Sequence, residues 1–324
     1  MKIIEFSKYG TPDDLCIKEV AIPVPKPDEV LVKIVASSIN SWDWELLCGT
    51  PFVNRIFFGL FKPKRLKTLG IDIAGRVENV GSKLAQLHVG DEVYGDLSAC
   101  GWGGFAEYVA VPAKVLSLKP ANITFEQAAA IPQAGLLAMQ GLVDSGHIHD
   151  GQKVLINGAS GGSGTLAIAI AKNYDVEITG VCSKPKMDFV RSLGVDHVID
   201  YQHEDFTRNG QQYDLILDAQ GHHSILDYRR ALSPNGAYVI HGGATSTINQ
   251  LMFLGPVFSL FGKRKFRLLL HKANKGLDVI SDLLRTGKVV PEIDQCFPLE
   301  QIPEAMHYYG QGKTRGKIVI KVES

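Results

Sequence analysis

The stretch that decides the fold of this 324-residue chain is Val154-Leu-Ile-Asn-Gly-Ala-Ser-Gly-Gly-Ser-Gly-Thr165. Its apolar start, Val154–Ile156, predicts a buried strand, and the small residues that follow predict a tight turn. The next segment, Leu166–Lys172, predicts a helix that packs closely on the sheet. A strand, a glycine turn and a helix in this order let backbone N–H groups approach a diphosphate at the helix N-terminus. The predicted ligand contacts are Gly158, Ala159, Ser160, Gly161, Gly162, Ser163 and Gly164.

The next predicted strand, Glu177–Cys182, completes a βαβ unit and indicates which dinucleotide binds. An NAD site has an acidic residue for the ribose hydroxyls about 20 residues after the turn. Here the corresponding stretch is Cys182-Ser-Lys-Pro-Lys186, with a hydroxyl and two ammonium groups. These groups suit a 2′-phosphate, so the pattern favours NADPH over NADH. The alternative is that Lys184 and Lys186 are only solvated loop charges.

The same glycine turn also fits a second class of enzyme. Gly158-Ala-Ser-Gly-Gly162 matches the G-x-S-x-G elbow of serine hydrolases, with Ser160 as the nucleophile. Asp218 and His241 follow in the order that such a triad requires. The additional glycines of the turn are unnecessary for an elbow, which favours the dinucleotide site over the hydrolase.

Composition restricts the class of protein. The 34 basic and 34 acidic residues give zero net charge, which implies no general attraction to nucleic acid. The five cysteines form neither a metal-binding spacing nor a disulfide framework, so we expect a reducing, cytoplasmic location. The N-terminus begins directly with a strand pattern, and no signal peptide is expected. The longest apolar run, Leu251–Phe261, is too short to span a bilayer.

The pattern of the chain changes near residue 122, which predicts two domains of an α/β protein. Residues 1–122 contain many short strands with Gly and Pro between them, which is typical of a partly open β-barrel. Residues 123–288 alternate strands and helices, which predicts a doubly wound parallel sheet. Residues 289–324 end in a strand that we expect to return to the first domain.

Several further motifs support a family assignment when they are taken together. They are Ala36-Ser-Ser-Ile-Asn-Ser-Trp-Asp43, Gly70-Ile-Asp-Ile-Ala-Gly75, Val89-Gly-Asp-Glu-Val-Tyr-Gly95, Gly103-Gly-Phe-Ala-Glu-Tyr108, Leu193-Gly-Val-Asp-His-Val-Ile-Asp-Tyr201 and Arg315-Gly-Lys-Ile-Val-Ile320. With the glycine turn, they resemble the medium-chain dehydrogenase/reductase superfamily, in its zinc-independent quinone oxidoreductase (ζ-crystallin-like) family.

The resemblance implies a fold and a set of contacts. The fold would be a GroES-like catalytic domain, 1–122 completed by 289–324, and a Rossmann NADP-binding domain, 123–288. In the family the coenzyme lies between the two domains. Besides the glycine turn, the implied cofactor contacts are Asn40, Ser183, Lys186, Tyr201, Gly242 and Gly243.

The donor chemistry argues against zinc. Zinc-dependent members of the superfamily carry Cys and His ligands where this chain has Asn40 and Gly70-Ile-Asp72. An amide is a poor zinc ligand and soft donors are missing, so no metal is predicted. The neighbouring histidines at 147 and 149, and at 222 and 223, are expected to face solvent.

Without zinc, the sequence predicts reduction of quinones or α,β-unsaturated carbonyls (enals and enones) with NADPH. Hydride transfer to such a substrate leaves an oxygen that needs a hydrogen-bond donor and a proton. Asn40 and Asp43 are the predicted catalytic residues: the Asn40 amide would donate to the oxygen or the cofactor, and the Asp43 carboxylate would orient Asn40 or a water. Asp43 alternatively only caps the following helix. A second class, a non-catalytic NADPH-binding protein with a structural or partner role, also fits the pattern.

An apolar and basic segment, 251–267, follows the Gly242–Gly243 turn. It predicts a wall or lid over a lipophilic substrate, a homodimer contact or a membrane-surface contact. We expect Gly255 and Pro256 to interrupt a continuous helix, which disfavours the membrane contact.

Overall fold

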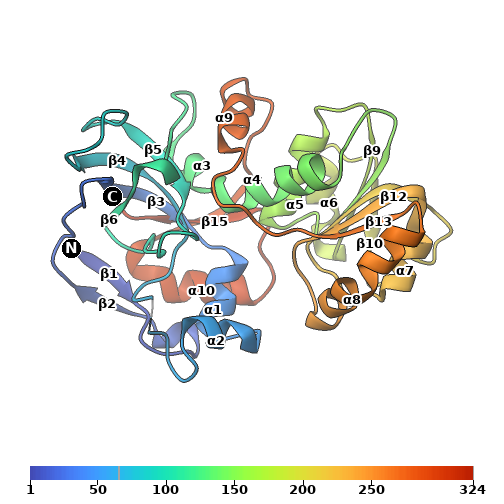
Figure 1. Ribbon diagram of the computed structural model, residues 1–324, viewed down its shortest axis with the longest axis horizontal. Coiled ribbons are helices and arrows are strands. Elements are labelled where there is room, and N and C mark those ends of the chain that lie inside the picture. Colours follow the sequence, from blue (N-terminus) through green and yellow to red (C-terminus); the bar gives the residue numbers. More distant parts are fainter. Residues whose placement is uncertain (65, 324) are drawn as a thin grey trace. The chain divides into compact units, whose positions relative to one another are not determined.

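The computed structural model describes residues 1–64 and 66–323, and these form two compact units (Figure 1). The first unit comprises Met1–Ala134, Ala273–Thr286 and Pro291–Ser324, and the second comprises Gly135–Lys272 and Gly287–Val290. Helix α3 (Phe125–Ala129) lies in the first unit because it packs on strands β3 and β4. The two units are defined by compactness, whereas the predicted domains are defined by function. The predicted domain boundaries at residues 122 and 288 therefore remain a prediction.

The first unit is built around β3 (Glu29–Ser38), a ten-residue strand with most of its positions buried. It pairs antiparallel with β4 (Asp72–Val80), β6 (Tyr108–Pro112) and β15 (Lys317–Lys321). The sheet order is β14-β15-β3-β4-β5-β7, and a separate hairpin joins β1 and β2. The remaining strands are β1 (Lys2–Glu5), β2 (Cys16–Glu19), β5 (Glu92–Asp96), β7 (Ser117–Leu118) and β14 (Ile293–Pro298).

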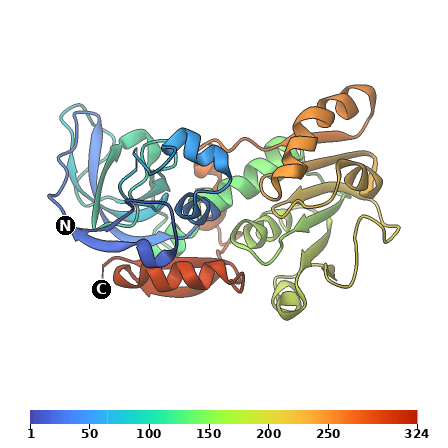
Figure 2. The ribbon, with the colours of Figure 1, turned by 90° about the horizontal axis from the view of Figure 1, so that it is seen from below.

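The C-terminal segment Pro291–Ser324 belongs to the first unit. Strand β15 places Val319 opposite Ser38 of β3. Helix α10 (Ile302–Gly310) lies beside the short helix η1 (Pro12–Asp14) near the N-terminus (Figure 2). The C-terminal end therefore completes the sheet around β3, and both ends of the chain contribute side chains to one core.

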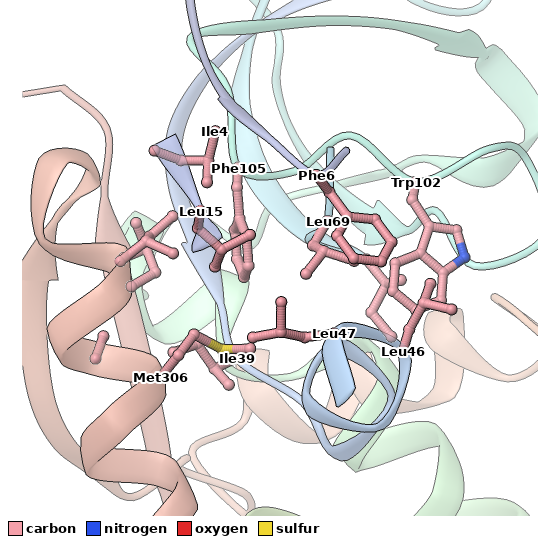
Figure 3. Close-up of a cluster of buried hydrophobic side chains, with 14 of the residues drawn as sticks. Ile4, Phe6, Leu15, Ile39, Leu46, Leu47, Leu69, Trp102, Phe105 and Met306 are labelled. Atoms are coloured by element: carbon pink, nitrogen blue, oxygen red, sulfur yellow. The ribbon is translucent and has the colours of Figure 1, made fainter. Parts of the chain in front are cut away.

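That core fixes helix α1 (Ser41–Cys48), which begins directly after Asn40. Leu46 and Leu47 of α1 are buried against Phe6, Phe105 and other side chains from the N-terminal strands and α10 (Figure 3). Burying one such side chain contributes roughly 1.5–3 kcal/mol. Trp44 also packs against this cluster, whereas Trp42 is 37% exposed. Packing of this apolar face therefore holds the N-terminus of α1 in a defined place.

The second unit is a six-stranded parallel sheet in the order β10-β9-β8-β11-β12-β13. From the centre of the sheet, β8, β9 and β10 follow one another toward one edge, and β11, β12 and β13 toward the other. This is the order of a doubly wound dinucleotide-binding fold. The strands are β8 (Lys153–Asn157), β9 (Glu177–Cys182), β10 (His197–Asp200), β11 (Tyr213–Asp218), β12 (Leu232–Ile240) and β13 (Lys265–Leu268). The predicted α/β fold class is confirmed.

Most expected elements occur within a few residues of their predicted ranges. The other helical segments are α2 (Phe52–Phe58), η2 (Ala113–Val115), α4 (Pro132–Met139), η3 (Gln140–Ser145), α5 (Gly162–Ala171), η4 (Lys184–Lys186), α6 (Met187–Ser192), α7 (Ile225–Ala231), α8 (Thr245–Phe261), α9 (Leu277–Arg285) and η5 (Leu299–Gln301). Helix α2 was not predicted. None of the helices in the described part of the chain is both long and apolar enough to cross a membrane.

One expectation about local structure was wrong. Helix α8 runs through Gly255 and Pro256 as a single 17-residue helix and packs against α7 and β13. Gly255 is buried, and a Cβ there would lie 3.5 Å from Cβ of Phe266 in β13. Packing against the sheet therefore stabilises a helix that local propensity alone disfavours.

Candidate functional site

The glycine turn lies between β8 and α5, and two of its glycines serve different purposes. Gly158 has φ +86°, a conformation that favours glycine. A Cβ on Gly164 would lie 2.2 Å from the carbonyl oxygen of Gly158, so only glycine allows α5 to approach the strand this closely. A Cβ on Gly161 would have only that same oxygen near it, at 3.5 Å. The backbone beside Gly161 is therefore open to a ligand.

The N-terminus of α5 supplies hydrogen-bond donors to that open space. The first backbone hydrogen bond at the N-terminus of α5 joins the N–H of Thr165 to the carbonyl of Gly161. The preceding N–H groups of Gly162, Ser163 and Gly164 have no acceptor within their own helix. Free N–H groups and the helix dipole at this end favour an anion. The turn from Gly158 to Gly164 thus fits a diphosphate.

Strands β8 and β11 are neighbours, and polar side chains link their carboxyl ends. The Asn157 side-chain amide donates to Asp218 Oδ1 over 2.8 Å, and the Tyr238 hydroxyl donates to Asp218 Oδ2 over 3.0 Å. The Gln220 N–H donates to Oδ1 over 2.8 Å. Burial raises the pKa of Asp218, which is fully buried. This network sits at the point where the strand order reverses, where ligands of such sheets bind.

The hydrolase interpretation is not supported by this geometry. Both carboxylate oxygens of Asp218 accept hydrogen bonds from groups other than His241. The bond between His241 and Asp218 joins the His241 backbone N–H to the Asp218 backbone carbonyl. Burial lowers the pKa of His241 to about 4. Ser160 is 7% exposed and does not have the positive φ of a strained turn. The three residues therefore form no catalytic triad.

The residues predicted for the 2′-phosphate lie together at the ends of β9 and β10. Strand β9 ends at Cys182, and Ser183 begins the short helix η4, which contains Lys184 and Lys186. The N–H of Tyr201, the residue after β10, donates to the Cys182 carbonyl over 3.2 Å. Ser183, Lys186 and Tyr201 thus share one corner of the sheet edge.

That corner also contains a carboxylate that the sequence analysis missed. Asp200 ends β10 opposite Cys182, in the adjacent strand. Burial alone would raise its pKa, but hydrogen bonds from the Gln202 N–H and the His203 ring lower it. The His203 Nδ1–Asp200 Oδ2 distance is 2.6 Å, so the carboxylate is hydrogen-bonded within its own turn. Parallel pairing of β9 with β10 was the only signal that could have revealed it.

The Gly242–Gly243 turn follows β12 at the same edge. Gly243 has φ +130°, and a Cβ there would lie 2.3 Å from the backbone nitrogen of Gly221. The Gly221 N–H donates to the Gly242 carbonyl over 3.1 Å, and Gly221 accepts from Ala244 over 2.7 Å. The carboxyl ends of parallel strands lie at one edge, so the structure brings all predicted contacts of the second unit to that edge.

In the first unit, Asn40 belongs to a buried network centred on Lys317 and Asp72. The Lys317 ammonium donates to Asn40 Oδ1 over 2.6 Å and lies 3.5 Å from Asp72 Oδ2. The Asn40 amide donates to Asp72 Oδ2 over 2.9 Å. Burial lowers the pKa of Lys317 and raises that of Asp72, although each charge opposes the shift of the other. The sequence predicted neither Lys317 nor a role for Asp72 beyond its departure from a zinc-ligand motif.

This network constrains what Asn40 can do. Asn40 is 5% exposed, and its amide hydrogens point to Asp72 and, over 3.5 Å, to the carbonyl of Ser38. An amide has two donor hydrogens. Asn40 in this arrangement therefore offers no donor to a substrate oxygen, and its side chain is held in one orientation.

Asp43 acts as a helix cap and an anchor. Its Oδ2 accepts from the Asn40 N–H over 2.9 Å, and its Oδ1 accepts from the Gly70 N–H over 2.8 Å. Burial raises the pKa of Asp43 to about 7. Because both oxygens bond to backbone, Asp43 fixes the start of α1 and thereby the backbone of Asn40. The predicted capping role of Asp43 agrees with these contacts, and its predicted catalytic orienting role stays a prediction.

The donor set does not fit a zinc ion. Asn40 stands at one expected ligand position and Ile71 at the other, and the ammonium of Lys317 lies between the side chains of Asn40 and Asp72. Within residues 1–64 and 66–323, no three His, Cys, Asp or Glu side chains are grouped so that they could hold a metal. His222 and His223 stack at 4.1 Å between ring centroids, and His223 is partly buried rather than exposed.

Comparison with known proteins agrees with this architecture. The family model for an alcohol dehydrogenase GroES-like domain matches residues 26–121, and the model for a zinc-binding dehydrogenase matches residues 193–320. The 2-methylene-furan-3-one reductase of Solanum lycopersicum is 32% identical over 334 residues, covering 99% of this chain and 79% of that protein. The chain belongs to the medium-chain dehydrogenase/reductase superfamily.

Two further similarities place it in the quinone oxidoreductase family of that superfamily. The chloroplastic NADPH-dependent alkenal/one oxidoreductase of Arabidopsis thaliana is 32% identical over 335 residues, covering 99% of this chain and 79% of that protein. The quinone oxidoreductase of Coxiella burnetii has a TM-score of 0.88 at 29% identity, covering 100% of this chain and 99% of that one. The family that the motifs predicted is confirmed.

The Lys317–Asp72 pair yields a stability prediction. Removing one partner of a buried ion pair typically costs about 3–5 kcal/mol, since the other charge is left without compensation. We expect Lys317→Met to lower the free energy of unfolding by about that amount in urea titrations. Lys317→Met combined with Asp72→Asn should recover part of the loss, and Lys313→Met, at an exposed position, should have little effect. An unchanged midpoint for Lys317→Met would contradict the role of this ion pair.

Glu45 in α1 yields a pH prediction. Burial raises the pKa of Glu45 to about 7, well above its ordinary value. The folded state therefore binds this proton more tightly than the unfolded chain. The resulting stability is fully present below the ordinary carboxyl pKa of 4.5 and is lost progressively as pH rises from there to about 7. We expect Glu45→Gln to reduce the loss of stability between pH 5 and pH 8 by roughly 2 kcal/mol. Urea unfolding at several pH values, with the exposed Glu304→Gln as control, would measure it; parallel pH curves for wild type and Glu45→Gln would refute it.

Proposed function

We propose that this protein is an NADPH-dependent, zinc-independent oxidoreductase that reduces quinones or α,β-unsaturated carbonyls. The observation that carries the proposal is the open glycine cradle at the switch point of a doubly wound sheet, in a chain whose relatives carry quinone, furanone and alkenal reductase names. Within the described residues, the chain offers no metal-holding group for a Lewis-acid role. A small lipophilic carbonyl or quinone is the proposed substrate.

The proposed coenzyme is NADPH, which supplies the hydride when it is bound. The N–H groups at the start of α5 would hold its diphosphate. Ser183, Lys186 and Tyr201 would bind the 2′-phosphate through two hydroxyls and one ammonium group. The Gly242–Gly243 turn lies at the same sheet edge and would contact the rest of the dinucleotide through backbone.

We propose that Asn40 and Asp43 act by positioning. Asp43 holds the backbone of Asn40, and Lys317 and Asp72 hold its side chain. The remaining lone pair of Asn40 Oδ1 is the group left to contact the coenzyme. Fixed polar groups of this kind reduce the reorganisation that accompanies hydride transfer.

The segment 251–267 is the proposed wall for a lipophilic substrate. Among the described side chains of α8, four large apolar ones are exposed: Met252, Phe253, Leu254 and Leu260. Apolar surface beside a dinucleotide edge is the usual environment of such a substrate. Homodimer formation and a cytoplasmic location remain proposals; all five cysteines are free, as a reducing compartment requires.

The function is tested by NADPH consumption. Purified protein is expected to oxidise NADPH in the presence of at least one compound from a panel of quinones, enals and enones, and metal chelation should leave the rate unchanged. Tight NADPH binding without turnover of any panel compound would favour the non-catalytic, partner-binding alternative. Labelling of Ser160 by a fluorophosphonate would instead indicate a hydrolase.

Coenzyme choice depends on Lys186. We expect NADPH to raise the melting temperature more than NADH, and Lys186→Ala to weaken NADPH binding about tenfold through one lost charge-assisted contact. NADH binding should be unaffected. Lys153→Ala, at the opposite end of the same sheet, is the matched control. Equal loss of affinity for both coenzymes in Lys186→Ala would refute the 2′-phosphate assignment.

A further inference from the structure

Helix α2 of the first unit turns its apolar side toward solvent. Phe52, Val53, Ile56 and Phe57 are 63%, 47%, 63% and 61% exposed. These positions are spaced so that they share one face of the helix. A surface helix ordinarily buries such a face and exposes its polar one. The apolar face of α2 is therefore available to something outside the unit.

The opposite, inward side of α2 is anchored largely by polar groups. The Arg55 guanidinium donates to the Gly49 carbonyl over 3.0 Å and lies 4.9 Å from the centre of the Tyr9 ring. The Asn54 amide donates to the Thr50 carbonyl over 2.8 Å. Only Phe58 packs inward, against Trp102. These contacts fix the rotation of the helix, so the outward orientation of its apolar face is specified by the fold.

The chain continues from α2 into exposed lysines. Leu60 and Phe61 are 46% and 89% exposed, and Lys62, Lys64 and Lys67 follow, all exposed. Backbone bonds hold this turn in place: the Lys64 N–H donates to the Phe58 carbonyl over 2.9 Å, and the Phe6 N–H donates to the Lys67 carbonyl over 2.7 Å. The ammonium groups are thus kept beside the apolar face.

The charge of this region is one-sided. The sequence from Leu46 to Ile71 contains no Asp or Glu and five basic residues: Arg55, Lys62, Lys64, Arg65 and Lys67. The whole chain, in contrast, has zero net charge. None of the three exposed lysines forms an ion pair with a described residue. Their charges are therefore available to an anionic partner.

We propose that residues 52–64, 66 and 67, the α2 segment, are a docking surface for an anionic lipid bilayer. Aromatic and aliphatic side chains with adjacent lysines are the combination that binds the boundary between headgroups and acyl chains. The apolar side chains enter that boundary while the ammonium groups contact lipid phosphates. With seven residues, α2 is far shorter than the roughly 20 that span a bilayer, so the contact is superficial.

Two other occupants fit the surface less well. A second copy of the chain would bring two uncompensated positive segments together, which is unfavourable. A protein partner would need a groove complementary to the convex face of a helix, whereas a bilayer adapts to any convex shape. The proposal is independent of the coenzyme and of the reaction.

Sedimentation of the full-length protein with lipid vesicles tests the proposal. We expect binding to vesicles containing roughly one-third phosphatidylglycerol, little binding to pure phosphatidylcholine, and release as salt rises. Phe57→Ser combined with Phe61→Ser should weaken vesicle binding about tenfold or more, because two aromatic side chains that would enter the bilayer are lost. Lys62→Gln, Lys64→Gln and Lys67→Gln together should weaken it by a similar factor.

Matched controls distinguish binding through the α2 segment from non-specific binding of the protein to vesicles. Phe253→Ser with Leu260→Ser removes apolar groups of similar exposure, 77% and 78%, from α8. Lys114→Gln, Lys288→Gln and Lys313→Gln neutralise three other exposed lysines. Both control variants should bind vesicles like the wild type, and melting curves confirm that every variant is folded.

Three outcomes would overturn the proposal. The first is no binding of the wild type to anionic vesicles at low salt, and the second is equal loss in the control variants. The third is vesicle-independent self-association that Phe57→Ser with Phe61→Ser abolishes, which would assign the α2 segment to a second copy of the chain.

Discussion

The second unit depends on the close approach of α5 to β8 at Gly164. A Cβ there would lie 2.2 Å from the carbonyl oxygen of Gly158, so a larger residue would push the helix away from the strand. The approach brings the free N–H groups of the helix to the sheet edge, next to the junction of β8 and β11. The hydrogen-bonded Asn157–Asp218 pair then forms a rigid base for that edge. Backbone geometry thus creates the anion site, and side chains serve to hold it.

The first unit achieves its rigidity through buried charge. Lys317 arrives from the C-terminal strand, Asp72 from β4, and Asn40 from the end of the loop before α1. An ammonium group therefore contacts Asn40, which stands at a position where metal-dependent members of the superfamily place a ligand. The consequence is a polar cluster with no open coordination position, which suits a reductase that needs no Lewis acid. The cluster also joins three distant parts of the chain around one residue that the proposed chemistry requires to be fixed.

The proposed activity and the proposed lipid contact depend on different parts of the chain and on different interactions. Reduction depends on backbone donors and a fixed amide, whereas the α2 segment depends on exposed apolar area and unpaired positive charge. A lipophilic quinone or enone is concentrated in membranes rather than in water, so a bilayer contact would bring the enzyme to its substrate. The two proposals are nevertheless separable, because each has a measurement that does not involve the other.

The sequence alone determined the α/β class, the glycine turn and the positions of most strands along the chain, because glycine spacing and apolar periodicity are local properties of the chain. It also identified Asn40 and Asp43, which lie three residues apart at one helix start. Only the tertiary structure revealed the partners of Asn40, since Lys317 is 277 positions away and no local pattern links the two. The same holds for Asp200 beside Cys182, and for the continuous helix through Pro256, where sheet packing overrides propensity. The outward face of α2 likewise depends on which side the surrounding fold anchors, and that is decided by contacts with Tyr9 and Trp102 rather than by the helix itself.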